Sequence, residues 1–304
     1  MKIASLLPSA TEIVYALGLG DDLVGVTDEC DYPPAAVTKP VISRSALSQG
    51  HLQTPREIDN AVRDKVGAGE PIYQLDVDLL RRTQPDVILT QDLCRVCAVP
   101  SGQVQVALDK LGLPDAKVVS LDPNTLDEVI STIGAVAKML EREDKGAELV
   151  AALQQRVAMV KDKAKRLPTI GVFALEWSDP PFSAGHWIPG MITAVGGTPV
   201  LAEDGQPSRE TAWHEVRDAM PEVIVFMPCG YYLEEAEEEA DTFLSQPEFA
   251  DTPAVRNGNV YAVDATSYFS RPGPRLVDGL EIMAWAAHPD AYAAPPAGTI
   301  AKLG

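Results

Sequence analysis

The chain has 304 residues and a net charge of −19 at pH 7. Its length favours two domains of about 130–150 residues each, and its hydrophobic fraction of 46% is typical of a folded chain. The negative charge disfavours nucleic acid and anionic lipid as partners, and no stretch approaches the roughly 20 apolar residues of a membrane span. We therefore expect neither a nucleic-acid partner nor membrane insertion.

The first part of the chain alternates strand-like and helix-like segments. KIASLL (2–7) and LVGVT (23–27) predict strands, and PSATEIVYALGLG (8–20) between them predicts a helix that ends at glycines. DVILT (86–90) predicts a further, buried strand. Because strands that alternate with helices are typical of parallel sheets, residues 1–123 are expected to form an N-terminal α/β lobe.

A helical segment follows. Residues 124–167 hold apolar side chains at helical spacing, with two glycines, Gly134 and Gly146, and no proline. The spacing predicts one long connecting helix of roughly 40 residues, about 60 Å at 1.5 Å per residue. A break near Gly146 is the alternative.

The remaining residues, 168–304, repeat the order of the first lobe. TIGVFAL (169–175) predicts a strand, IPGMITAVGG (188–197) a helix, EVIVFMP (222–228) a buried strand and NVYAVD (259–264) a last strand. A repeated order predicts two lobes of similar topology. The predicted fold class is α/β, with two Rossmann-like βα lobes joined by the long helix and a ligand cleft between the lobes.

Residues 176–191, EWSDPPFSAGHWIPGM, crowd large rings into a segment that we expect to be neither strand nor helix. Pro180 and Pro181 lack the amide proton that either structure needs. The rings belong to Trp177, Phe182, His186 and Trp187. Since the loop follows a predicted strand and precedes a helix, it is expected to face a ligand. The alternative is a loop that packs only on its own lobe.

Each cysteine falls just after a predicted strand. The four are Cys30, Cys94, Cys97 and Cys229. Ligands of open parallel sheets bind outside the carboxyl ends of the strands, so these thiols are expected to point toward the cleft. The spacing of Cys94 and Cys97 suits a dithiol redox pair or half of a site for a soft metal ion. The alternative is that the cysteines are small buried hydrophobic residues.

Two further side chains are candidates for ligand contacts. His186 can offer an imidazole to a metal ion, and Arg271 can bind an anionic group. No P-loop, nucleophile elbow or HExxH motif is present. The chain is therefore not expected to be an enzyme.

Three stretches carry a family resemblance. They are residues 6–36, which include DYPP, residues 179–185, DPPFSAG, and residues 268–283, YFSRPGPRLVDGLEIM. With these motifs the chain resembles the helix-linked (class III) substrate-binding proteins of ABC importers of metal chelates, and most of all their cobalamin-binding members. The resemblance implies that Tyr32 lies in the cleft, and TQDLCRVCAVP (90–100) together with EWSDPPFSAGHWIPGM (176–191) is similar to a leaderless cytosolic branch. The family's first-lobe tryptophan is missing near SRSALSQG (43–50).

The resemblance also bears on partners and location. Transported members dock on a permease through one exposed acidic residue per lobe. Asp78 stands at the first position, but His214, next to Glu215, stands at the second, so permease docking is not favoured. The N-terminus has only a five-residue apolar run before Pro8, unlike a secretory signal. A cytoplasmic location is expected, or a periplasmic one if a leader was removed.

The predicted function is non-catalytic binding of a large flat ligand, cobalamin or another corrinoid, between the lobes. The predicted ligand-binding residues are Tyr32, Trp177, Phe182, His186, Trp187, Tyr268, Phe269 and Arg271. Aromatic side chains bury large areas at a modest cost in entropy, which suits a macrocycle. The alternative is a cytoplasmic metal-binding, thiol-redox or corrinoid-handling protein that uses the pair Cys94 and Cys97, with a metal ion as a further cofactor.

Overall fold

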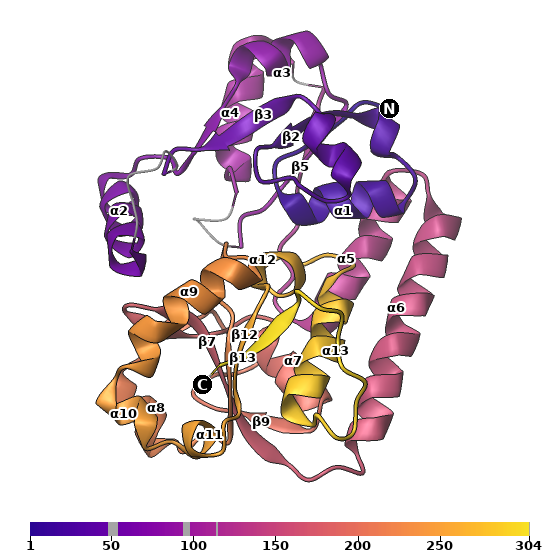
Figure 1. Ribbon diagram of the computed structural model, residues 1–304. Coiled ribbons are helices and arrows are strands. Elements are labelled where there is room, and N and C mark those ends of the chain that lie inside the picture. The colour runs from indigo at the N-terminus through magenta and orange to yellow at the C-terminus, as the bar shows by residue number, and fades with distance from the viewer. Residues whose placement is uncertain (48–53, 94–97, 114, 304) are drawn as a thin grey trace. The chain divides into compact units, whose positions relative to one another are not determined.

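The computed structural model describes residues 1–47, 54–93, 98–113 and 115–303. The chain folds into two compact units, and its elements can be followed in Figure 1. Unit 1 comprises Met1–Pro123 and Thr132–Leu149, and unit 2 comprises Asn124–Ser131 and Val150–Gly304.

Unit 1 is built on a mostly parallel sheet. The described residues form six strands in the order β4-β3-β2-β1-β5-β6, and all neighbours are parallel except β3 and β4. The strands are β1 (Ile3–Ser5), β2 (Leu23–Thr27), β3 (Val41–Ser45), β4 (Tyr73–Leu75), β5 (Val87–Thr90) and β6 (Lys117–Ser120). The helices are α1 (Pro8–Ala16), α2 (Pro55–Ala68), α3 (Val77–Thr83) and α4 (Ser101–Leu111), with short 3-10 helices η1 (Gly20–Asp22) and η2 (Pro34–Thr38). The α/β class predicted for this part of the chain is confirmed.

The apolar run DVILT becomes the buried strand that the sequence predicts. Every residue of β5 is buried, as expected for a central strand of a parallel sheet with both faces covered. Ile88 of β5 belongs to a core cluster with Ala4 of β1, Leu80 of α3 and Leu108 of α4. The core of unit 1 therefore joins strands and helices that are far apart in the sequence.

The prediction of a single helix over 124–167 is wrong. The segment forms two helices, α5 (Leu126–Met139) and α6 (Glu143–Ala164). Glu141 has a φ of 56°, and the Arg142 amide donates to the Ala137 carbonyl at 2.8 Å, so the chain turns in the left-handed way that ends helices.

Gly146 does not make this break. It lies inside α6, where an added Cβ would come closer than 3.0 Å to the Ala137 Cβ of α5. The glycine therefore allows the two helices to approach closely. The charges Lys138 in the last turn of α5 and Glu143 in the first turn of α6 complement the helix dipoles on either side of the break.

Unit 2 repeats the plan with a larger sheet. Its described strands follow the order β10-β8-β7-β11-β12-β13, and β9 also pairs with β7. The strands are β7 (Ile170–Ser178), β8 (Pro181–Ser183), β9 (Gly197–Pro199), β10 (Arg209–Glu210), β11 (Val223–Phe226), β12 (Val260–Val263) and β13 (Ile300–Leu303). The helices are α7 (Ile188–Ala194), α8 (Trp213–Asp218), α9 (Leu233–Leu244), α10 (Pro247–Ala250), α11 (Pro253–Arg256), α12 (Ala265–Tyr268) and α13 (Leu276–Ala287).

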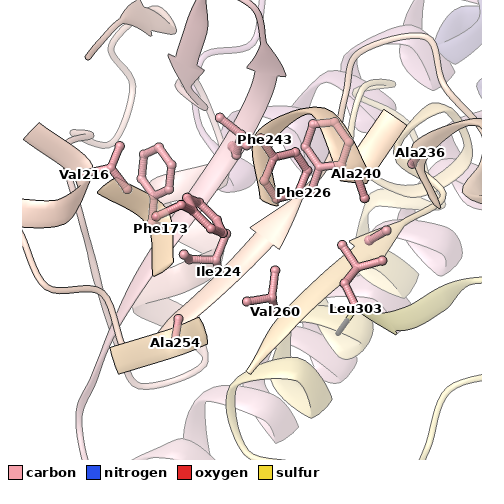
Figure 2. Packing of buried hydrophobic residues seen from close by; sticks show 13 residues of the cluster. Phe173, Val216, Ile224, Phe226, Ala236, Ala240, Phe243, Ala254, Val260 and Leu303 are labelled. Atoms are coloured by element: carbon pink, nitrogen blue, oxygen red, sulfur yellow. The ribbon is translucent and has the colours of Figure 1, made fainter. Parts of the chain in front are cut away.

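Aromatic rings fill the core on one side of this sheet. Phe226 of β11 lies 4.6 Å from Phe243 of α9 between ring centroids, and Phe243 lies 5.2 Å from Phe249 of α10. Figure 2 shows Phe226 and Phe243 side by side within this cluster. The acidic helix α9 is thus fixed to the sheet by its apolar face, and its glutamates lie on the other faces.

Candidate functional site

The segments that follow three parallel strands of unit 2 begin at the same edge of the sheet. β11 pairs in parallel with β7 on one side and with β12 on the other. We call the edge formed by residues 176–187, 227–232 and 264–271 the carboxyl edge of unit 2. In open α/β sheets ligands bind at such edges.

Part of the predicted aromatic loop is a β-hairpin, which corrects the expectation that no strand could run there. β7 extends to Ser178, and β8 begins at Pro181. A proline is tolerated as the first residue of a strand because the missing amide is then not needed for the ladder. The Pro181 carbonyl still accepts from the Thr211 amide at 2.8 Å.

The hairpin brings three aromatic side chains together. Trp177 and Phe182 are paired across β7 and β8, so both side chains lie on the same face. The Tyr231 ring meets Trp177 edge to face, with 5.7 Å between centroids. All three side chains are partly exposed. Tyr231 was not predicted, although it follows a predicted strand just as the cysteines do.

Trp187 and Phe269 tie two segments of the carboxyl edge to each other. The Trp187 indole N–H donates to the Phe269 carbonyl oxygen at 2.8 Å. Both side chains are buried, with 6% and 2% of their surfaces exposed. The Trp187 and Phe269 side chains therefore pack in the interior of unit 2. The aromatic surface at this edge comes instead from Trp177, Phe182 and Tyr231.

The other predicted residues of unit 2 also lie on this edge. His186 is partly exposed, its ring lies 5.7 Å from the Trp187 ring, and burial lowers the pKa of its imidazole from the ordinary 6.5. The Arg275 guanidinium lies 5.8 Å from the centroid of the Tyr268 ring, a cation–π contact. Arg271 is 8% exposed. At neutral pH the imidazole is uncharged and can accept a hydrogen bond or bind a metal ion.

A partly buried carboxyl group that sequence reasoning missed stands directly before Trp177. Glu176 lies where the pairing of β7 and β8 is irregular, and the Ser208 hydroxyl donates to its carboxylate. Burial raises the pKa of the Glu176 carboxyl above its ordinary 4.5, although hydrogen bonds from Ser208 and from the Gly185 amide oppose the change. No pattern in the sequence links Glu176 with Ser208.

The raised pKa of Glu176 predicts a pH-dependent stability. A group whose pKa is higher in the folded state than in the unfolded state stabilises the fold at low pH. This stabilisation is fully present below the unfolded-state pKa, near 4.5, and is lost as the pH rises through the folded-state pKa. Glu176→Gln removes this term. The free energy of unfolding of the variant, compared with that of the wild type, should therefore increase as the pH is raised above 4.5. Denaturant unfolding at a series of pH values measures the difference, and parallel curves for both proteins would refute it.

In unit 1 the predicted residues lie at the equivalent strand ends. Tyr32 follows β2 and is 45% exposed. Cys30 is buried, with its Sγ 3.1 Å from the Thr11 Oγ1. Cys94 and Cys97 lie outside the described residues. The prediction that the segments of both lobes face one cleft concerns the two units together and stays a prediction.

The metal and thiol interpretations find no support in the described part of the chain. There, no group of three or more His, Cys, Asp or Glu side chains is arranged to hold a metal ion. Cys229 follows β11 and is exposed, and its amide donates to the Glu176 carbonyl at 3.3 Å. A lone cysteine in this setting defines no metal site.

Asp78, the first position compared with permease-docking residues, and Glu215, the neighbour of the second position His214, differ in their surroundings. Asp78 is exposed on α3 and forms an ion pair with Arg81 at 3.0 Å. Glu215 accepts from the Thr211 hydroxyl at 2.8 Å and from the Ala212 amide at 2.9 Å, which holds the pKa of its carboxyl below the ordinary range. The Glu215 carboxylate is therefore engaged in capping α8.

A hollow of about 770 Å³ in unit 2 lies apart from these residues. It is lined by the first turn of α5, the last turns of α6 and one side of α7, with Asp127, Lys161 and Asp204 among its polar groups. None of the predicted ligand-binding residues lines it. In the described part of the chain, no helix is long and apolar enough to cross a membrane.

Two α/β units, with an edge of exposed aromatic side chains at the carboxyl ends of parallel strands, define the class of solute-binding proteins. The chain belongs to the periplasmic binding protein family, whose model matches residues 3–266.

Similar proteins extend over almost the whole chain. A vitamin B12-binding protein of Vibrio cholerae is 25% identical over 283 residues, which cover 92% of this chain and 86% of the relative. The crystal structure of periplasmic vitamin B12-binding protein from Vibrio cholerae superimposes with a TM-score of 0.68 at 23% identity, covering 94% of this chain and 96% of the other. A periplasmic heme-binding protein from Roseiflexus sp. RS-1 gives 0.69 at 24% identity, with 95% and 98% covered.

Proposed function

We propose that this protein is a non-catalytic binder of a large flat macrocycle, with cobalamin or another corrinoid as its ligand. The similar proteins are named for vitamin B12 and for heme, which are both metal-containing tetrapyrrole macrocycles. Vitamin B12-binding proteins of two genera, Vibrio and Yersinia, are similar in sequence to this chain, and this similarity supports a corrinoid as the first ligand to test.

The observation that carries the proposal is the aromatic group at the carboxyl edge of unit 2. Trp177, Phe182 and Tyr231 keep part of their ring surface in water although each side chain is large. Grouped, exposed apolar surface of this kind is typical of binding sites. A flat macrocycle would cover the rings over a wide area, and the neutral His186 imidazole at the same edge can approach its metal ion.

Trp177→Ala is expected to weaken binding of aquocobinamide by about 10- to 30-fold, because a central aromatic contact is commonly worth about 1.4–2 kcal/mol. The change in the visible spectrum during titration measures the affinity. Circular dichroism checks that the variant retains the fold.

Met220→Ala is the matched control. Met220 is 48% exposed and precedes β11, so it lies beside the amino ends of the same strands. Its affinity should equal that of the wild type. If Trp177→Ala also binds as the wild type does, the ligand does not use the aromatic group and the proposed site is wrong.

A further inference from the structure

A short segment before β10 holds the backbone of the predicted ligand loop at several points. The His186 amide donates to the Gln206 carbonyl at 2.5 Å, and the Gly205 amide donates to the His186 carbonyl at 3.0 Å. The Gly185 amide donates to the Ser208 Oγ at 3.0 Å. The backbone of residues 185 and 186 is therefore hydrogen-bonded to Gly205, Gln206 and Ser208.

The two segments are too close for any side chain at position 185. A Cβ added to Gly185 would come closer than 3.0 Å to the backbone of Gln206, Pro207 and Ser208. The next residue, His186, has a φ of 51°, a left-handed conformation that is uncommon for a residue other than glycine. Such a conformation persists when neighbouring contacts impose it.

The Ser208 hydroxyl connects this backbone to the strand that carries Trp177. It accepts from the Gly185 amide and donates to the Glu176 carboxylate, so one oxygen joins the ligand loop to β7. The Ser208 hydroxyl hydrogen points at the Glu176 carboxylate, so the oxygen lone pairs are left to accept from the Gly185 amide, and both bonds are partly shielded from water.

We propose that Glu176 and Ser208 are positioning residues, which set the conformation of Gly185 and His186 and thereby the placement of the His186 ring and of Trp187. Neither residue needs to touch the ligand. The inference rests on the proposed function only where it assigns residues 185–187 to a ligand site. The hydrogen bonds of Ser208 to Gly185 and Glu176 lie within unit 2 and do not depend on that function.

Hydrogen exchange and ligand affinity test the proposal together. In Ser208→Ala the Gly185 amide loses its acceptor, so the segment 185–188 should open more readily and its amides should exchange about 10-fold faster. Binding of aquocobinamide should weaken by about 5- to 10-fold, since a mobile loop has to be ordered on binding. Ser208→Thr retains the hydroxyl and should restore both values.

Ser178→Ala is the control, because Ser178 also donates to a carboxylate, that of Glu239, at 2.9 Å, and stands on the same strand. It should leave exchange at residues 185–188 unchanged. Unchanged exchange there in Ser208→Ala would overturn the proposal, as would equal effects of the two alanine variants. If the wild type binds no macrocycle, the proposed function fails, while the exchange measurement still decides whether the Ser208 hydroxyl holds the loop.

Discussion

Replacing Phe243 with alanine is expected to lower the free energy of unfolding of unit 2 by about 3–5 kcal/mol, the usual cost of removing a buried phenylalanine ring. Phe243 has no exposed surface, and its ring contacts Phe226, Phe249 and Trp213 with centroids 4.6, 5.2 and 6.5 Å away. The rings around it come from β11, α10 and α8 and cannot all move inward to fill the cavity.

Tryptophan fluorescence during denaturant unfolding measures this loss for unit 2 alone. The four tryptophans of the chain, Trp177, Trp187, Trp213 and Trp285, all belong to unit 2. Thr242→Ala, the neighbouring exposed position on α9, should change the free energy by no more than about 0.5 kcal/mol. A similar, small effect for both variants would mean that the cluster does not form the core of this unit.

Gly279→Ala is expected to destabilise unit 2 by about 1–3 kcal/mol and to weaken ligand binding as well. A Cβ on Gly279 of α13 would come closer than 3.0 Å to the Tyr268 carbonyl oxygen of α12. Backbone atoms cannot rotate away as a side chain can, so α12 and the residues after it must shift. The predicted ligand-binding residues 268–271 would shift with them.

Gly102→Ala separates this steric effect from the general effect of placing alanine in a helix. Gly102 lies in α4, and an added Cβ would meet nothing within 4 Å. The variant should be as stable as the wild type or more stable by up to about 0.5–1 kcal/mol. If Gly279→Ala behaves in the same way, α12 and α13 do not pack as described.

Hydrophobic periodicity was sufficient to predict the α/β class and the strands β1, β2, β5, β7, β11 and β12, but it did not predict β3, β4, β8, β10 or β13. A buried strand such as DVILT can be predicted from its apolar composition alone, because both of its faces are covered. The break at residues 140–142 was missed because Glu141 adopts a left-handed turn without a glycine, and Gly146, which looked like the break, is a packing position. A left-handed helix end without glycine leaves little trace in the sequence.

The candidate site was predictable only in part, for a similar reason. The strand-end rule places Trp177, Phe182 and residues 268–271 at one edge, since β7, β11 and β12 are parallel. The rule could have found Tyr231 too. It could not show that Trp187 is buried against the Phe269 carbonyl, or that Ser208 reaches Glu176, because those contacts join segments 82 and 32 residues apart.

Titration of the wild-type protein with aquocobinamide, cyanocobalamin and hemin in parallel tests the central claim most directly. Visible spectra, calorimetric heat and quenching of the unit 2 tryptophans would be recorded on the same samples. The account predicts saturable binding at micromolar protein, with one ligand per chain and a corrinoid bound more tightly than hemin. Saturable binding of hemin alone would contradict the corrinoid assignment. The absence of a saturable change with all three macrocycles would contradict the binding function itself.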